Sequence, residues 1–258
     1  MTDVIDDEIA LLHDAAKRAE AYLRAVDTRR AFPDDITIAA LDAFDGALPQ
    51  AGKGEAATLR LLDEIGSPAT VTSNGPNYFG FVLGGTLPVA AAAERLAAAW
   101  DQCASNTVTS PVAARLEKTA AAWLLDVLDL PRDAGVAFGT SATACSISCL
   151  ATARRHLLAK AGWDVDRQGL AGAPAIRLVV SDLIHVTLLK GLKVLGFGSD
   201  NIVRAPVDEC GRVIPDQLPP LDNLTILCLQ AGEVNTGEFD PFAELIPAAK
   251  AAGAWVHV

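Results

Sequence analysis

The sequence predicts an α/β fold, a mostly parallel, doubly wound sheet with helices on both faces. Three observations support this prediction. From residue 111 onward, short apolar runs alternate with stretches of helical periodicity. The apolar runs are continuous and rich in β-branched residues, as in strands that are buried on both faces. With 258 residues, of which 51% are hydrophobic and 21% charged, the chain is long enough to bury a large core.

The first 72 residues are expected to form a helical arm. Its leading helix carries an apolar stripe at spacings of four and three residues, made of Ile5, Ile9, Leu12, Ala16, Ala19, Leu23 and Val26. The stripe packs either on the chain's own core or on a second subunit, and the sequence leaves both arrangements open. Loops near Phe32 and over residues 48–54 separate further short helices.

The second predicted domain, residues 73–258, begins with a shaped loop. Residues 73–86 read SNGPNYFGFVLGGT, and their Gly, Asn and aromatic content disfavours both a helix and a central strand. Helices are expected over residues 113–128, 143–160, 186–195 and 242–252. Strands are expected over residues 136–138, 176–180, 202–203, 225–229 and 254–258.

Charge and composition exclude several classes of function. A net charge of −11 disfavours nucleic acid and anionic membranes as partners, and favours a small-molecule ligand. The first ten residues are acidic where a signal peptide is basic and then apolar, and no apolar stretch is long enough to span a bilayer, so we expect a cytoplasmic protein. The five cysteines contain no CxxC pair, and we interpret them as buried free thiols, with no metal site expected.

Small and polar residues follow three of the predicted strands, at the edge where open α/β sheets bind ligands. Residues 139–143 (GTSAT) place hydroxyls and free helix N–H groups where they favour a phosphate, or they simply cap a helix. His185 follows the next strand, where its ring would cover a flat ligand or have only a structural role. Residues 230–237 (QAGEVNTG) form a third such junction. Because all three meet one sheet edge, together they favour a ligand site.

These junctions belong to a longer ordered set of motifs. The set comprises NYFG at 77–80, TSP at 109–111 with Glu117 and Trp123-Leu124, GTSAT at 139–143, Ser181-Asp182 with His185, QAG at 230–232, NTG at 235–237, FDP at 239–241 and WVHV at 255–258. This order closely resembles the group II pyridoxal-phosphate-dependent amino acid decarboxylases, which include the glutamate, aromatic-amino-acid and tyrosine decarboxylases. The resemblance implies the aspartate aminotransferase fold (fold type I), pyridoxal 5′-phosphate as cofactor, decarboxylation of an L-amino acid as the reaction, and a homodimer.

The resemblance also implies roles for individual residues around the cofactor. The phosphate would be held by Ser141, Ala142 and Thr143. His185, as a catalytic residue, would stack on the pyridine ring. Gln230, Glu233 and Asn235 would lie near the ring's substituents, although the family usually has threonines where this chain has Glu233 and Val234.

The loop at Tyr78 and Phe79 resembles the segment that walls the substrate pocket in this family. In the family this segment often reaches across a dimer interface. Two aromatic side chains in a Gly-rich loop are also compatible with a local hydrophobic plug, and the sequence does not separate the two interpretations.

Two residues that the family's chemistry requires are expected to be missing. They are the Schiff-base lysine and the carboxylate that keeps the pyridine nitrogen protonated, and in the family both follow the position of His257-Val258. The lysines that are present match surface positions better than a site at the sheet edge. The chain is therefore expected to be the amino-terminal part of a decarboxylase, or to be complemented by a separate carboxy-terminal half, and to be inactive alone. An aminotransferase or carbon-carbon lyase on the same fold, or a non-catalytic partner subunit, are the alternatives.

Overall fold

A computed structural model describes residues 2–258, with side chains from Val4 onward. The chain divides into two compact units between Asp101 and Gln102. The predicted arm, residues 1–72, falls wholly within the first unit.

The first unit is helical. It contains α1 (Thr2–Ala25), α2 (Asp35–Ala39), α3 (Glu55–Leu61) and α4 (Pro88–Trp100), with the short turns η1 (Val26–Thr28), η2 (Ala40–Phe44) and η3 (Leu62–Gly66). The predicted leading helix is confirmed. The Arg18 guanidinium ties α1 to the segment after α3, because it pairs with Asp14 at 3.0 Å and with Asp63 at 2.9 Å. Ile5, Ile9, Leu12 and Leu23 of the apolar stripe are about half exposed.

The predicted loop at residues 73–86 has no helix or strand. Phe81 and Val82 have φ angles of 56° and 51°, a left-handed conformation that costs energy for residues with a Cβ. Both side chains are largely exposed.

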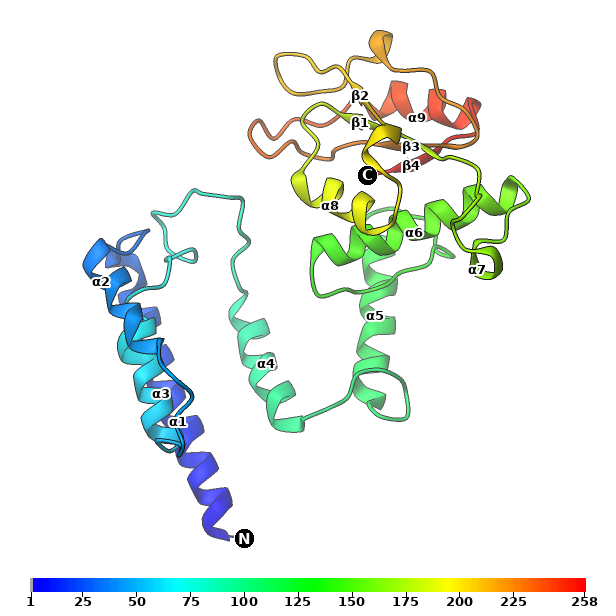
Figure 1. Ribbon diagram of the computed structural model, residues 1–258. Coiled ribbons are helices and arrows are strands. Elements are labelled where there is room, and N and C mark those ends of the chain that lie inside the picture. Colours follow the sequence, from blue (N-terminus) through cyan, green and yellow to red (C-terminus); the bar gives the residue numbers. More distant parts are fainter. Residues whose placement is uncertain (1) are drawn as a thin grey trace. The chain divides into compact units, whose positions relative to one another are not determined.

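The second unit is an α/β structure, and the predicted fold class is confirmed. Its helices are α5 (Pro111–Val127), α6 (Ala142–Lys160), α7 (Val165–Gln168), α8 (Val186–Val194) and α9 (Phe242–Ala251), with the 3-10 turns η4 (Ser199–Asn201) and η5 (Pro215–Gln217). Its strands are β1 (Arg177–Ser181), β2 (Ile202–Ala205), β3 (Thr225–Cys228) and β4 (Trp255–His257). All pairings are parallel, in the order β2-β1-β3-β4 (Figure 1).

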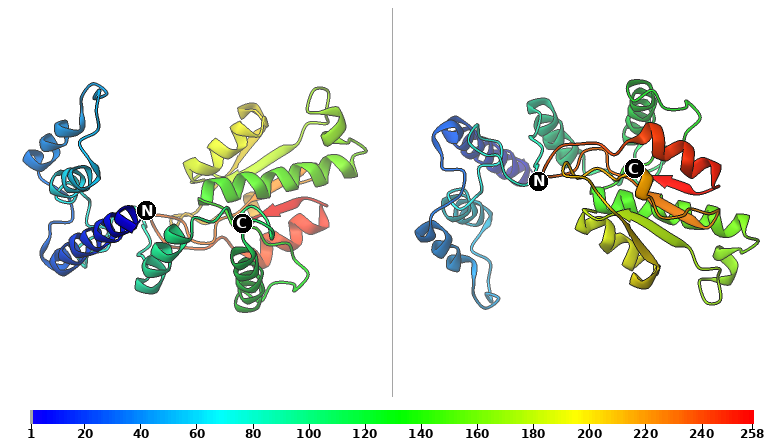
Figure 2. Two further views of the ribbon diagram at one scale, coloured as in Figure 1. Left: turned by 90° about the horizontal axis from the view of Figure 1, so that it is seen from below. Right: turned by 90° about the horizontal axis from the view of Figure 1, so that it is seen from above.

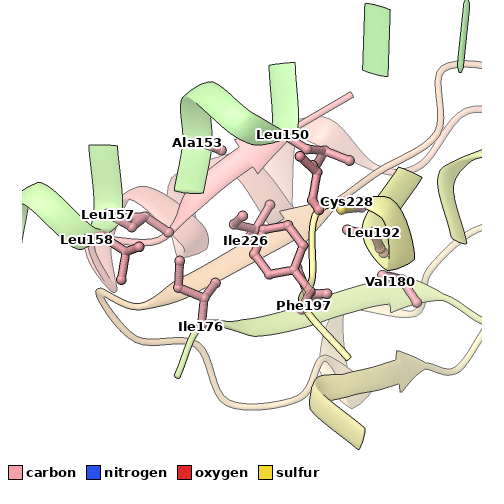
Figure 3. Close-up of a cluster of buried hydrophobic side chains, with 12 residues drawn as sticks. Leu150, Ala153, Leu157, Leu158, Ile176, Val180, Leu192, Phe197, Ile226 and Cys228 are labelled. Carbon is pink, nitrogen blue, oxygen red and sulfur yellow. The ribbon is translucent and has the colours of Figure 1, made fainter. Parts of the chain in front are cut away.

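Alternate residues of the strands face two separate cores, which makes the unit a three-layer sandwich. Leu178 and Val180 of β1 pack against α6 and α8, in the cluster shown in Figure 3. Val179, between them in sequence, packs against α9 with Leu245. Figure 2 shows the same layers, with α9 on the face of the sheet opposite α6 and α8. Both faces are buried, which explains why the strands read as continuous apolar runs.

Two predictions about local structure are wrong. Residues 136–138 form no strand, because within residues 2–258 no neighbouring strand supplies hydrogen bonds to them, and Phe138 is half exposed. The cysteines are free, but only Cys228 is buried. Cys103 and Cys149 are exposed, since they lie in a loop and on an outward face of α6.

Candidate functional site

The strand order creates a topological switch point between β1 and β3. The chain leaves β1 toward β2 on one side, then returns to place β3 on the other side of β1. The following helices, α8 and α9, cover opposite faces of the sheet. Loops that leave adjacent strands in opposite directions form a crevice at the carboxyl edge, which is where such sheets bind ligands. The loops concerned are residues 182–185 and residues 229–241.

The packing of α6 on α8 brings two helix N-termini to this same edge. A Cβ on Gly191 of α8 would lie 3.2 Å from Ile147 of α6, and Arg154 further along α6 donates to the carbonyl of Leu195 at 2.5 Å. The two helices therefore run in the same direction. Gly191 and Ile147 each lie five residues after the first residue of their helix. Because both helices rise about 1.5 Å per residue, their N-termini lie at the same level.

α6 also runs antiparallel to the strands. Leu157 and Leu158 pack beside Ile176, which precedes β1, whereas Leu150 lies near Cys228 at the end of β3 (Figure 3). His156 meets Trp255, the first residue of β4, with ring centroids 5.2 Å apart. The N-terminus of α6 therefore points to the carboxyl edge of the sheet.

At the start of α6, Ser141 is the N-cap. Its Oγ accepts a hydrogen bond from the Ala144 N–H at 3.2 Å, and its carbonyl accepts from Cys145. Among the described residues, the N–H groups of Ala142 and Thr143 have no partner. Unpaired N–H groups at a helix N-terminus are donors for an anion. The chain passes close to this turn at the preceding Gly139, where a Cβ would lie 2.7 Å from the Cys145 Sγ and would force that side chain to move.

His185 is the N-cap of α8. Its Nδ1 accepts from the Thr187 N–H at 3.3 Å and lies 2.6 Å from the Thr187 hydroxyl. Because Nδ1 accepts from the Thr187 N–H, a neutral ring carries its proton on Nε2. The side chain is otherwise exposed, so its ring is free to contact a ligand.

The turn after β3 closes on itself through Glu233. The carboxylate is 3% exposed and accepts from the N–H groups of Asn235 at 2.8 Å and Thr236 at 2.9 Å, and from the Asn235 Nδ2 at 2.8 Å. Burial is the largest single influence and raises the pKa of this carboxyl, but the hydrogen bonds together outweigh it and the pKa is lowered. Both Glu233 and the Asn235 amide are thus occupied within the turn, and a role for either toward a cofactor stays a prediction.

Gln230 differs from its neighbours in the same turn. Its Nε2 is buried and has no hydrogen-bond partner in the described part of the chain. A buried donor without a partner costs free energy unless a ligand or water completes it. Gln230 lies two residues after Cys228, the last residue of β3, at the switch point. Because this orphaned donor is buried, a ring-shaped ligand would reach it only if the side chains that cover it move aside.

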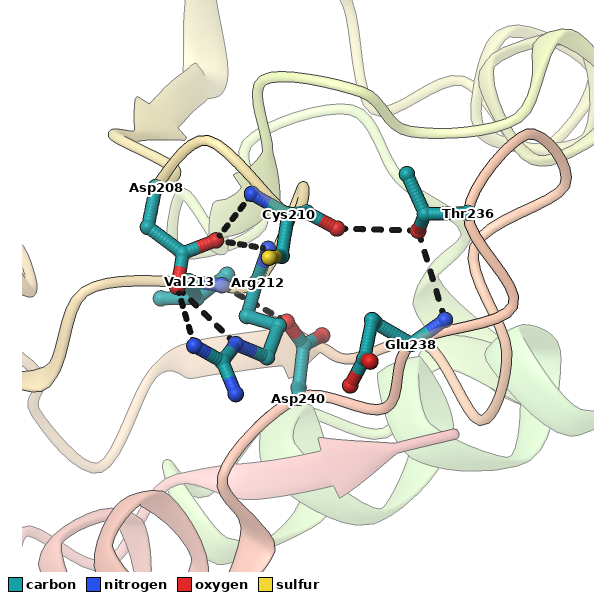
Figure 4. A network of polar contacts seen from close by, with 7 residues as sticks. All are labelled: Asp208, Cys210, Arg212, Val213, Thr236, Glu238 and Asp240. Atoms are coloured by element: carbon teal, nitrogen blue, oxygen red, sulfur yellow. Dashed lines mark hydrogen bonds and ion pairs between the residues drawn. The ribbon is translucent and has the colours of Figure 1, made fainter.

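The hairpin that follows β2, residues 207–213, packs against these loops (Figure 4). Asp208 closes its tip by accepting from the N–H groups of Cys210 and Arg212, both at 2.9 Å, which lowers the pKa of Asp208. A Cβ at Gly211 would lie 3.1 Å from Leu183 of the His185 loop and 3.3 Å from Glu233. The hairpin therefore contacts both loops of the crevice.

The structure thus brings most of the predicted cofactor residues to one edge, but encloses them little. A cavity of about 630 Å³ lies instead between the second half of α6 and Trp255, at the opposite edge of the sheet. Tyr78 and Phe79 belong to the first unit, where Phe79 is 91% exposed, and their role in a substrate pocket stays a prediction. Asp240, in the FDP motif at 239–241, is buried at the base of this turn, and no pattern in the sequence indicates a role for it.

Comparisons with known proteins agree with this geometry. No family model matches the chain. The acidic amino acid decarboxylase GADL1 of Bos taurus is 28% identical over 103 residues, which are 37% of this chain and 20% of that protein. The cysteine sulfinic acid decarboxylase of Rattus norvegicus is 28% identical over 103 residues, 37% of this chain and 21% of that protein. The matched segment therefore spans about a fifth of these curated relatives.

Solved structures match over nearly the whole chain. Mouse CSAD in its apo form superposes with a TM-score of 0.85 at 19% identity, covering 98% of this chain and 54% of that one. Oryza sativa TDC, solved with PLP and tryptamine, gives 0.82 at 23% identity, with 98% and 54% covered. The chain thus spans about half the length of these structures. No helix among residues 2–258 is long and apolar enough to cross a membrane. The fold of this chain is the fold of these enzymes, and its sequence relatives are amino acid decarboxylases.

Proposed function

We propose that this chain forms the cofactor-binding part of a pyridoxal-phosphate-dependent carboxy-lyase that acts on an L-amino acid. The observation that carries this proposal is the arrangement at the switch point. There the open N-terminus of α6, the exposed His185 ring and the unpartnered Gln230 amide meet one edge of the sheet. Such a set suits a small ring that carries a phosphate.

Each group has a distinct part in the proposed site. The free N–H groups of Ala142 and Thr143, with the Ser141 hydroxyl, hold the phosphate without needing a cationic side chain. The His185 ring covers one face of the pyridine, in the orientation that Thr187 sets. The Gln230 Nε2 donates to an oxygen at the ring's edge and so gains the partner that it lacks. When bound, the cofactor would supply the electron sink that decarboxylation requires.

We also propose that the 258 residues do not include the lysine that bonds to the cofactor aldehyde. Lys160 and Lys250 lie at the C-terminal ends of α6 and α9, which begin at the carboxyl edge and run away from it. Lys190 and Lys193 are exposed on α8. Lys118 is exposed on α5, and Lys17 and Lys53 belong to the first unit. None of these seven amines is hydrogen-bonded to Gln230 in the described residues, so a second polypeptide segment would supply the reacting lysine and the carboxylate for the pyridine nitrogen.

The lack of enclosure at this edge of the sheet also supports the proposal that part of the site is supplied by another segment. The candidate residues lie on an exposed edge, whereas an enzyme that stabilises a carbanion benefits from an enclosed site. We therefore propose that the complete protein is a dimer or a complemented assembly in the cytoplasm. The substrate is a small amino acid. The names of the relatives point to both acidic and aromatic amino acids, and the assay below covers both classes.

Binding of pyridoxine 5′-phosphate tests the proposed site. This compound carries the ring and the phosphate but has no aldehyde, so it does not react with surface lysines. We expect saturable binding by calorimetry, in competition with inorganic phosphate, and weaker binding in His185→Ala. His156→Ala is the matched control and should leave the affinity unchanged, because the His156 ring packs against Trp255 at the opposite edge of the sheet. No binding by the unsubstituted chain would refute the proposed site.

Borohydride trapping tests the missing lysine. After incubation with pyridoxal phosphate, reduction should label the exposed lysines at low and similar levels, and neither glutamate nor tryptophan should release carbon dioxide. A single heavily labelled lysine, together with decarboxylation, would show that the chain is active by itself and that a lysine has been misplaced.

A further inference from the structure

Asp240 is a buried aspartate that the proposed cofactor contacts do not use. Its side chain is 4% exposed. It lies ten residues after Gln230, at the base of the loop that follows β3, and two residues before the first residue of α9. A buried carboxylate costs free energy unless it is hydrogen-bonded, so its partners indicate why it is there.

The two carboxylate oxygens of Asp240 bind two backbone segments that are distant in sequence. Oδ2 accepts from the Gln230 N–H at 2.6 Å, and Oδ1 accepts from the Val213 N–H at 2.8 Å (Figure 4 shows the second contact). The Asp240 N–H in turn donates to the Gln230 carbonyl at 3.1 Å. Gln230 is therefore held on both sides of its Cα by one residue.

The same carboxylate fixes Gln230 relative to the rest of the crevice. Val213 belongs to the hairpin after β2, whose tip meets Leu183 and Glu233. Through Asp240, the exit of β3 is thus joined to a hairpin that also supports the loop leading to His185. The Thr236 hydroxyl donates to the Cys210 carbonyl at 2.8 Å and makes a second link between hairpin and turn.

We propose that Asp240 is a positioning residue, which sets the backbone of Gln230 so that its side-chain amide meets the ring of the bound cofactor. This inference rests on the proposed function. Asp240 contacts no ligand itself and acts through Gln230. It is not expected to affect the phosphate, because Ser141 and the start of α6 have no contact with the Asp240 carboxylate in the described residues.

The substitution Asp240→Asn tests the inference with little change of volume. An asparagine amide accepts at one atom only, so one of the two backbone N–H groups would face an NH2 donor. We expect about a tenfold loss of affinity for pyridoxine 5′-phosphate, with the affinity for inorganic phosphate unchanged. The matched control is Asp208→Asn, which makes the same charge change in the hairpin but retains the single oxygen that accepts from Cys210 and Arg212.

A double-mutant cycle with Gln230→Ala separates positioning from general damage. If Asp240 acts through Gln230, then Asp240→Asn has little further effect on pyridoxine phosphate affinity once the Gln230 amide is gone. Equal weakening of phosphate and pyridoxine phosphate, additive effects in the cycle, or no effect at all would overturn the inference. If Asp240→Asn fails to fold by circular dichroism, Asp240→Glu, which keeps the charge and lengthens the side chain, enters the same cycle. Absence of binding by the unsubstituted chain would instead refute the proposed function, and this inference with it.

Discussion

Ser141 has two roles in the structure and the proposal, and the substitution Ser141→Ala separates them. As an N-cap, its Oγ has a single, rather long bond of 3.2 Å in an exposed position. Such a cap contributes about 0.5–1 kcal/mol. For a unit of about 150 residues, this loss corresponds to a fall of about 2 °C in Tm.

As a phosphate ligand, the same hydroxyl contributes more. A hydrogen bond to a charged group contributes about 1.5–3 kcal/mol, which corresponds to a loss of roughly 10- to 100-fold in affinity. We therefore expect Ser141→Ala to weaken the binding of inorganic phosphate and of pyridoxine 5′-phosphate by a common factor. Calorimetric titration and thermal unfolding by circular dichroism measure the two roles independently.

Ser110→Ala is the matched control for the capping role. Ser110 is the N-cap of α5 in the same unit, is fully buried and accepts from the Ala113 N–H at 3.4 Å. We expect this substitution to lower Tm at least as much as Ser141→Ala, because a buried group is lost, and to leave phosphate affinity unchanged. If Ser141→Ala lowers Tm but not affinity, or if Ser110→Ala weakens phosphate equally, the assignment of Ser141 to the phosphate is wrong.

Three further predictions concern stability and reactivity. Leu150→Ala should lower the free energy of unfolding of the second unit by about 3 kcal/mol in urea titrations, because the Leu150 side chain is fully buried between α6 and the sheet. The same change at Leu116, which is 60% exposed, should lower it far less. Cys103 should react with thiol reagents at pH 8, since the hydrogen bond to Ser105 lowers its pKa. Cys228 should stay unmodified until the unit unfolds, because burial raises its pKa to about 12. Glu233→Gln should lower Tm at pH 7, and the difference in Tm between the two proteins should shrink below pH 4.5. A carboxyl whose pKa is lowered in the folded state stabilises the fold above its ordinary pKa, and this contribution is lost as the pH falls through the folded pKa.

The strands were predictable because burial on both faces leaves a plain signal in the sequence. Val179 and its neighbours form a continuous apolar run, and parallel strands bring their carboxyl ends to one edge whatever the details of the loops. Residues 136–138 carry the same signal but form no strand. A strand requires a hydrogen-bonding neighbour, and a sequence shows the propensity of a segment without showing its partner.

The polar contacts of the site were less predictable, for a related reason. The inward fold of Glu233 depends on the turn geometry at Gly232 and Gly237, with φ angles of 106° and 76°. The bond from Asp240 to Val213 joins residues 27 positions apart, on different connections of the sheet. Neither follows from periodicity. The orphaned Gln230 amide became recognisable only when the donors and acceptors around it were known.

The two halves of the proposed site are held by different forces, and this difference determines how substitutions in each half will act. The helices α6 and α8 are anchored by buried side chains, Leu150 and Leu192, so the free N–H groups at the start of α6 are already in place before an anion binds. The loop that carries Gln230 is mostly exposed and is kept in shape by the carboxylates of Glu233 and Asp240. Segments held mainly by hydrogen bonds open locally at lower free energy than segments held by packing. The phosphate half should therefore bind as a preformed site, while the ring half gains order on binding, and amide hydrogen exchange at residues 230–237 should slow with pyridoxine phosphate but not with phosphate alone.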